Sequence, residues 1–96
     1  MKSTYPTAEM KELFHAIRSI RSQEEAAYFF RDLLTLPEIE EFANRWQIVK
    51  RLVRKESYLK ISKEIKVSTT TVSRVAHWLK SGMGGYAAVS KRIFSS

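Results

Sequence analysis

Apolar residues recur three or four positions apart along nearly the whole chain, which is the spacing of one face of an α-helix. No internal repeat or low-complexity segment interrupts this pattern. The pattern therefore predicts an all-α fold. We expect six helices, at about residues 6–20, 22–34, 35–54, 58–65, 68–79 and 86–94.

Local signals mark where several of these helices begin or end. Ser22-Gln-Glu-Glu25 and Thr35-Leu-Pro-Glu38 have the form of capping boxes, in which a hydroxyl and a carboxylate bind the first free N–H groups of a helix. Pro6 suits the first turn of a helix, where its missing N–H is not needed. The run SGMGG at 81–85 predicts a helix stop or a hinge.

The first three predicted helices carry wide apolar faces. These faces comprise Met10, Leu13, Phe14, Ile17 and Ile20; then Ala26, Phe29, Phe30, Leu33 and Leu34; then Ile39, Phe42, Trp46, Ile48, Val49, Leu52 and Val53. Ninety-six residues suffice for one domain, but six short helices leave more apolar surface than one chain can cover. We therefore expect a single domain, residues 1–96, that forms an obligate homodimer. Residues 1–56 would be mainly dimerisation helices, followed by a helix-turn-helix at 57–80 and a C-terminal helix at 86–94.

The segment at 57–80 has helix-turn-helix spacing. Ser57 and Ser68 are placed to cap its two helices, and Ser62 is small enough to let them cross closely. The turn position is often glycine because it suits a left-handed conformation, so Lys66 there predicts some strain or a slightly different turn. The residues expected to face inward are Ile61, Ile65, Val67, Val72, Val75, Ala76 and Leu79.

The run VSTTTVSRV at 67–75 is unusual for a helix, because β-branched residues lose side-chain freedom there and small hydroxyls compete for main-chain hydrogen bonds. It suits the start of a recognition helix, where short side chains let the main chain approach the base edges of DNA. Lysines on or just after the preceding helix are expected to bind phosphates. The candidate DNA-binding residues are Lys60, Lys63, Lys66, Ser68, Thr69, Thr70, Thr71, Ser73 and Arg74. The alternative is a solvated polar helix.

Charge divides sharply along the chain, whose net charge is +7. Residues 1–43 hold five Lys/Arg against eight Asp/Glu, a net of −3, whereas residues 44–96 hold twelve against two, a net of +10. The two acidic residues of the second half are Glu56 and Glu64. A polyanionic partner is therefore expected for this half, the alternative being a basic surface without a partner.

Composition excludes several other classes of site. The chain has no cysteine, and its two histidines, His15 and His77, are far apart, so neither a disulfide framework nor a metal site is expected. The longest uncharged apolar run, at 26–30, is far too short to span a membrane, and no signal peptide is recognisable, so we expect a cytoplasmic protein. Adjacent carboxylates such as Glu24-Glu25 and Glu40-Glu41 splay apart on a helix, so no enzyme chemistry and no cofactor is expected.

Taken together, LLTLPEIEEFANRWQIVKRLVRKE at 33–56 and the helix-turn-helix resemble the Trp repressor family, and its YerC-like branch in particular. The resemblance covers roughly residues 33–93. LLT closely followed by Pro-Glu, Arg45 before Ile48-Val49, and Arg74 closing the recognition segment keep the family's order. The resemblance implies an all-helical fold whose two chains interlock and present two reading heads to one face of double-stranded DNA.

The resemblance also implies an effector site. In tryptophan-binding members of the family a planar amino-acid corepressor lies between two arginines, and Arg45 and Arg74 match those positions. Judged from the residues alone, Arg45 could instead pair with Glu41 one turn earlier. Val75 and Trp78 replace small residues of the family, and Trp78 is placed either to stack beneath Arg74 or to pack into a dimer core. Any corepressor is therefore expected to be a small amino acid other than tryptophan. The candidate effector-binding residues are Thr35, Arg45, Arg74 and Trp78.

These observations predict a dimeric, sequence-specific transcriptional regulator, a repressor, that binds a palindromic operator and responds to an amino acid. The first alternative is an effector-independent architectural or replication-associated DNA-binding protein, which the same helix-turn-helix would serve. A protein-interaction adaptor or a small enzyme is a weaker alternative.

Overall fold

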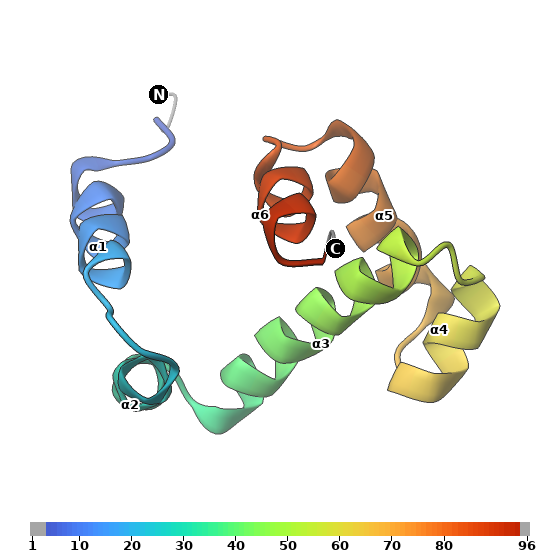
Figure 1. Ribbon diagram of the computed structural model, residues 1–96, viewed down its shortest axis with the longest axis horizontal. Helices are drawn as coiled ribbons and strands as arrows, with labels where there is room; N and C mark the ends of the chain where they lie inside the picture. Colours follow the sequence, from blue (N-terminus) through green and yellow to red (C-terminus); the bar gives the residue numbers. More distant parts are fainter. Residues whose placement is uncertain (1–3, 95–96) are drawn as a thin grey trace. The chain divides into compact units, whose positions relative to one another are not determined.

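The computed structural model describes residues 4–94, which fold into six helices without a β-strand (Figure 1). The helices are α1 (Ala8–Arg18), α2 (Gln23–Leu33), α3 (Leu36–Val53), α4 (Tyr58–Ile65), α5 (Thr69–Ser81) and α6 (Gly85–Phe94). The all-α prediction is confirmed. Each predicted helix is present, and α4 has the predicted bounds.

The start of α1 differs from the prediction. Thr7 is the N-cap, and its hydroxyl accepts a hydrogen bond from the N–H of Met10 at 3.2 Å. The helix therefore begins at Ala8, and Pro6 precedes it rather than lying in its first turn. A threonine hydroxyl that satisfies a free N–H stabilises the helix start more directly than a proline that only lacks one.

Both predicted capping boxes are present. Thr35 and Glu38 bind one another reciprocally: the Glu38 carboxylate accepts from the Thr35 N–H at 2.9 Å, and the Thr35 hydroxyl accepts from the Glu38 N–H at 3.3 Å. The box at α2 is shifted by one residue on its return side. Ser22 accepts from the N–H of Glu25 at 3.0 Å, but the Glu25 carboxylate accepts from the N–H of Arg21 at 2.8 Å.

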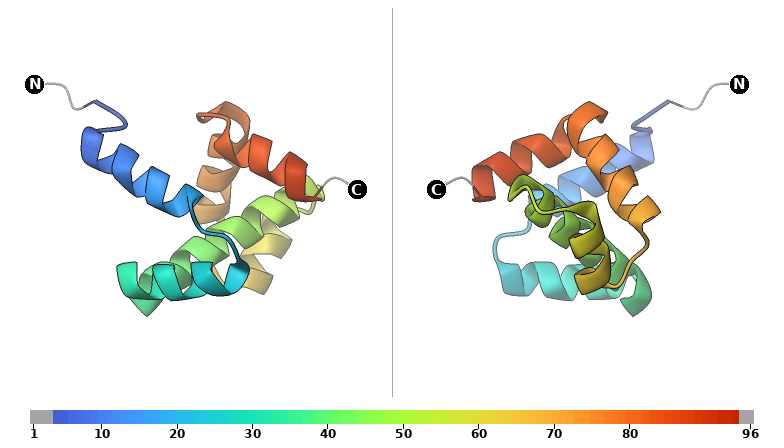
Figure 2. Two further views of the ribbon diagram at one scale, coloured as in Figure 1. Left: turned by 60° about the vertical axis from the view of Figure 1, so that its left-hand side comes forward. Right: turned by 90° about the vertical axis from the view of Figure 1, so that its right-hand side faces the viewer.

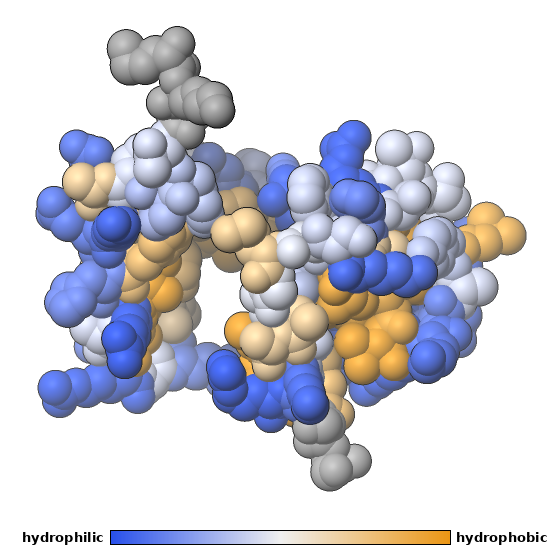
Figure 3. All heavy atoms as spheres, turned by 90° about the horizontal axis from the view of Figure 1, so that it is seen from above, coloured by the Kyte–Doolittle hydropathy of each residue, from blue (hydrophilic) through white to orange (hydrophobic). Residues whose placement is uncertain are grey.

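The chain separates into two compact units, which meet in sequence at Ile39 and Glu40 near the start of α3. In the first unit, neither α1 nor α2 has a buried residue. Met10 and Phe14 on α1 and Leu33 on α2, all predicted to face a core, are 40 %, 42 % and 45 % exposed. Figure 3 shows hydrophobic residues at the surface of each unit on the face that it displays.

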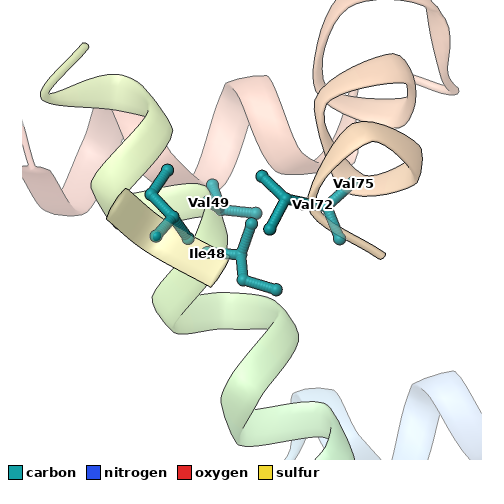
Figure 4. Packing of buried hydrophobic residues seen from close by; sticks show 5 residues of the cluster. Ile48, Val49, Val72 and Val75 are labelled. Carbon is teal, nitrogen blue, oxygen red and sulfur yellow. The ribbon is translucent and has the colours of Figure 1, made fainter. Parts of the chain in front are cut away.

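The second unit contains the hydrophobic core. Its buried cluster consists of Ile48, Val49, Ile61, Val72 and Val75. Figure 4 shows the side chains from α3 and those from α5 pointing toward one another. Helix α5 contacts both α4 and α6, as the views in Figures 1 and 2 show. The inward face predicted for the helix-turn-helix is confirmed, since Ile65, Val67 and Leu79 also pack against this cluster.

Aromatic contacts attach α6 to α3. The Trp46 ring lies 6.3 Å from that of Tyr86 and 5.3 Å from that of Phe94, measured between centroids. The preceding turn depends on Gly82, where a Cβ atom would lie 2.5 Å from the carbonyl oxygen of Trp78. Within residues 4–94, no helix combines the length and the apolar character needed to cross a bilayer.

Candidate nucleic-acid interface

The turn between α4 and α5 holds the two helices at a fixed angle. Lys66 adopts the left-handed conformation, with φ 66° and ψ 48°. A residue with a Cβ atom therefore takes the conformation that glycine usually supplies, which agrees with the strain predicted for this turn. The Ser62 carbonyl accepts from the N–H groups of Lys66 and Val67 at 2.9 and 3.1 Å. The Ser62 hydroxyl donates to the Val67 carbonyl at 2.5 Å. Ser62 therefore stabilises the turn through both its carbonyl and its hydroxyl group, in addition to being small.

The start of α5 shows how the threonine run becomes helical. Ser68 is the N-cap, and its hydroxyl accepts from the N–H of Thr71 at 3.0 Å. The two hydroxyls of Ser68 and Thr71 lie 2.9 Å apart, and Thr71 is half-buried. The hydroxyls that could disrupt a helix interior thus stabilise a helix end.

The side chains of α5 divide into two faces. Val72, Val75 and Ala76 are buried in the core. The opposite side lines an open groove of about 580 Å³ together with Tyr58 at the start of α4; the lining residues are Tyr58, Thr69, Thr70, Ser73, Arg74, His77 and Trp78. Four of the predicted DNA-binding residues are therefore brought together: Thr69, Thr70, Ser73 and Arg74.

Three groove residues were not among the predicted DNA-binding residues: Trp78, which was predicted as an effector-binding residue, and His77 and Tyr58, which were not predicted as site residues. His77 lies three and four positions after Arg74 and Ser73, so helical spacing alone could have placed it on the same face. Tyr58 belongs to α4, and its position beside α5 depends on how the two helices pack. No pattern within α4 reveals that contact.

The predicted lysines are exposed on or just after α4, as expected of phosphate-binding residues. Within residues 4–94, Lys63, Lys66 and Arg74 form no ion pair, whereas the Lys60 ammonium lies 3.9 Å from the Glu56 carboxylate. These basic groups are therefore available to bind an anionic partner. Lys60 would give up its long contact with Glu56 to do so.

An ion-pair network centred on Arg51 connects the end of α3 to α4. The Arg51 Nε is 2.6 Å from the Glu56 carboxylate, and Nη2 binds the Glu64 carboxylate. The hydrogen bonds to Glu64 and Glu56 raise the pKa of Arg51 above its usual value, and the bond from Arg51 lowers the pKa of Glu56. Arg51 therefore stays charged and favours the charged form of Glu56.

Comparison with known proteins identifies the family. The family model for the Trp repressor protein matches residues 8–93. The chain belongs to the Trp repressor family. It is 36 % identical over 85 residues to the protein YerC of Bacillus subtilis (strain 168), covering 88 % of this chain and 82 % of YerC. The predicted resemblance, including its YerC-like branch, is thereby confirmed.

Solved structures agree with this assignment. A TrpR-like protein from Eubacterium eligens superimposes with a TM-score of 0.87 at 36 % identity, covering 93 % of this chain and 92 % of the other. A chain from Staphylococcus aureus has the same TM-score at 33 % identity, covering 98 % of each chain. Proteins of the Trp repressor family and YerC-like relatives are DNA-binding regulators rather than enzymes, which is the class predicted.

Arg45 and Arg74, the two arginines implied by the resemblance to the Trp repressor family, line different hollows of the second unit. Arg45 pairs with Glu41 and lies over the Phe42 ring, 5.9 Å from its centroid. Arg45 also lines a hollow of about 250 Å³ with Phe42, Trp46 and Tyr86. Arg74 lines the groove of α5 instead. The alternative considered from the residues alone, pairing with Glu41, is therefore present in the structure.

One of the two alternatives predicted for Trp78, a stack beneath Arg74, is not found in the structure. Among residues 4–94, the cation–π contact is that of Arg45, and the Trp78 indole does not stack beneath Arg74. The Trp78 ring instead meets the His77 ring edge to face, 5.1 Å between centroids, and is 51 % exposed. Val75 packs in the core, so it does not crowd the space beside the exposed Arg74. The helical turn directs consecutive residues to different faces, which places Val75 and Arg74 apart.

Thr35 is the remaining implied effector residue. Its N–H and hydroxyl both donate to the Glu38 carboxylate, at 2.9 and 3.0 Å. These bonds lower the pKa of Glu38. Thr35 thus has a structural role at the start of α3.

Proposed function

We propose that this protein is a homodimeric, sequence-specific transcriptional repressor that reads a palindromic operator with the exposed face of α5. The observation that carries the proposal is the division of α5 into two faces. One face is fixed in the core by Val72 and Val75, and the other presents Thr69, Thr70, Ser73 and Arg74 along one groove. Hydroxyls and a guanidinium are the groups that read base edges.

Basic side chains of α4, of the turn after it and of α5 support a nucleic-acid partner. Lys63, Lys66 and Arg74 have no carboxylate partner within residues 4–94. Lys60 and Lys63 lie three positions apart on α4, so they point to one side of that helix. In the proposal these lysines bind phosphates and set the register of the reading head, whereas Arg74 and the hydroxyls of α5 distinguish bases. Ser68 caps the start of α5, where the helix dipole favours a phosphate.

Unburied apolar surface on the first two helices supports the proposed homodimer. Helices α1 and α2 are amphipathic, yet neither buries a residue in the single chain. An isolated helix pair of this kind gains too little burial to offset the entropy of folding. In the proposal a second copy covers Met10, Phe14 and Leu33, and the dimer is one domain with two reading heads.

An amino-acid effector belongs to the same proposal. The hollow lined by Phe42, Arg45, Trp46 and Tyr86 offers a guanidinium at the edge of an aromatic surface. These groups suit the carboxylate and side chain of a small amino acid, which would displace Glu41 from Arg45. Tryptophan is not the proposed effector, because Trp78 lines the groove beside Arg74 at a position where the family has a small residue, and its indole narrows the space there.

Selection of bound genomic fragments tests the proposal. The purified protein is mixed with sheared genomic DNA at near-physiological salt, with and without a panel of amino acids, and the bound fragments are sequenced. A repressor of this kind enriches a small set of sites that share an inverted repeat. Uniform recovery of all fragments, with affinity set only by salt, would favour the architectural alternative.

A further inference from the structure

Both acidic residues of the basic half of the chain bind the same arginine. Residues 44–96 contain twelve Lys/Arg and two acidic residues, Glu56 and Glu64. The Arg51 guanidinium contacts both of their carboxylates. A carboxylate near a DNA-binding surface repels phosphates unless it is neutralised, so this shared use of one arginine calls for a physical explanation.

Arg51 joins three consecutive segments. It lies near the end of α3, Glu56 lies in the connection that follows, and Glu64 lies in the last turn of α4. The Arg51 side chain and that of Glu56 are each 17 % exposed, whereas Glu64 is 52 % exposed. The Arg51 carbonyl also accepts from the N–H of Glu56 at 3.2 Å, past the left-handed Lys55 at φ 65°. Glu56 is thus held to Arg51 through main chain and side chain together.

Apolar packing alone leaves α4 weakly held. This helix has eight residues; Ile61 is its single buried one, and Ile65 packs against the core while partly exposed. Two apolar side chains one turn apart fix the distance of a short helix from the core, but they resist a small rotation of the helix about its own axis poorly. The planar guanidinium fork restricts two carboxylates in direction as well as in distance. The Glu64 contact therefore limits how α4 can turn.

We propose that Arg51 is the positioning residue of the reading head: by holding Glu56 and Glu64, it orients α4 so that Lys60 and Lys63 face the DNA backbone. The inference rests on the proposed function, in which these two lysines bind phosphates. Lys63 adjoins Glu64 in sequence, and Lys60 lies 3.9 Å from Glu56. Rotation of α4 would move both lysines, and release of the carboxylates would place negative charge beside them.

The test compares Arg51→Met with Arg54→Met, a matched control. Both variants remove one arginine from the end of α3, but Arg54 has no ion pair within residues 4–94. The operator dissociation constant is measured over a range of salt concentrations. Each phosphate contact contributes about 0.9 to the slope of log affinity against log salt, so loss of both lysine contacts in Arg51→Met should reduce the slope by about 2. Affinity should fall by about tenfold or more in Arg51→Met, while Arg54→Met keeps the wild-type slope.

Two further variants separate positioning from charge and from unfolding. Arg51→Lys keeps the charge but lacks the guanidinium fork, so its operator affinity and salt slope should remain close to those of Arg51→Met. Glu64→Gln removes only the ion pair between Arg51 and α4, and it leaves the contact of Arg51 with Glu56 intact. This variant should also reduce the salt slope. A wild-type salt slope in Arg51→Met, or wild-type affinity and slope in Arg51→Lys, would overturn the inference. If the wild-type protein shows no preferred operator, the proposed function fails instead.

Discussion

The Ser68 hydroxyl lies 2.9 Å from the Thr71 hydroxyl and accepts a hydrogen bond from the N–H of Thr71 at 3.0 Å. Two hydroxyls from the threonine-rich run are therefore engaged with each other at the start of α5. Thr69, Thr70 and Ser73 remain on the exposed groove. The same run thus caps the helix and supplies its reading face.

Ser68 substitutions should separate helix stability from DNA binding. Ser68→Ala removes the cap and should cost about 0.5–2 kcal/mol. For a chain of this size, that lowers the melting midpoint by several degrees. Ser68→Asp keeps a capping oxygen, so its midpoint should stay near the wild type, but its charge should weaken operator binding by repelling phosphate. Equal operator affinities of Ser68→Asp and wild type would place DNA away from the start of α5.

The exposed apolar face of α1 should be a dimer contact. Phe14→Glu replaces an aromatic ring, which is 42 % exposed in the single chain, with a charged side chain. If a second copy covers this ring, light scattering should show dissociation toward monomers and the melting midpoint should fall. His15→Glu, at an exposed neighbouring position on a different side of the helix, is the control and should remain dimeric. A wild-type monomer at micromolar concentration, with a melt independent of concentration, would contradict the dimer.

The capping box at α3 should make stability depend on acid. Hydrogen bonds from Thr35 lower the pKa of Glu38 below its ordinary value of 4.5 in the folded state. A lowered folded pKa means that the stabilisation is fully present above pH 4.5 and is lost as the pH falls through the folded value. Thermal melts of Glu38→Gln should therefore lose part of the wild-type dependence on pH in this acidic range. Glu40→Gln, which removes an exposed carboxylate of the same helix, should follow the wild type; identical curves for all three proteins would show that the box contributes nothing.

L-tryptophan should not act as the corepressor. The Trp78 indole lines the groove beside Arg74 at a position where the family has a small residue, so it takes up space that a second indole would need. A ligand at 100 times its dissociation constant adds about 2.7 kcal/mol, which would move the midpoint by about 10 °C or more. Millimolar L-tryptophan should leave both the melt and operator affinity unchanged, whereas Trp78→Ser is the variant in which a response is expected to appear. A tryptophan-dependent gain in operator binding by the unmodified protein would refute this account.

Local patterns were sufficient to predict the helices. The period of apolar residues and the caps at Ser22, Thr35, Ser57 and Ser68 act within a few residues of one another, so they can be read directly from the chain. The buried face of the helix-turn-helix follows from the same period. The start of α1 was misplaced because two local signals, Pro6 and Thr7, compete within two residues, and the one that makes a hydrogen bond determines the boundary.

Contacts between helices were not predictable in the same way. The bond between Arg51 and Glu64 spans thirteen positions, and Tyr58 joins the groove through the packing of α4 on α5. Neither follows from a periodicity within one helix. The predicted stack of Trp78 on Arg74 used a correct helical spacing, but the indole has the His77 ring as an adjacent partner. Spacing identifies which side chains share a face, and packing decides which of them touch.

The effect of Arg74→Ala on base preference tests the central claim most directly. The operator found by selection is varied one base pair at a time, and each variant is measured with wild type, Arg74→Ala and Lys60→Ala. We expect Arg74→Ala to cost about 1–3 kcal/mol and to lose discrimination at one position in each half-site, related by the two-fold symmetry. Lys60→Ala should weaken all variants alike and lower the salt slope by about 1. Uniform weakening by Arg74→Ala, with every base preference retained, would contradict the claim that the exposed face of α5 reads the sequence.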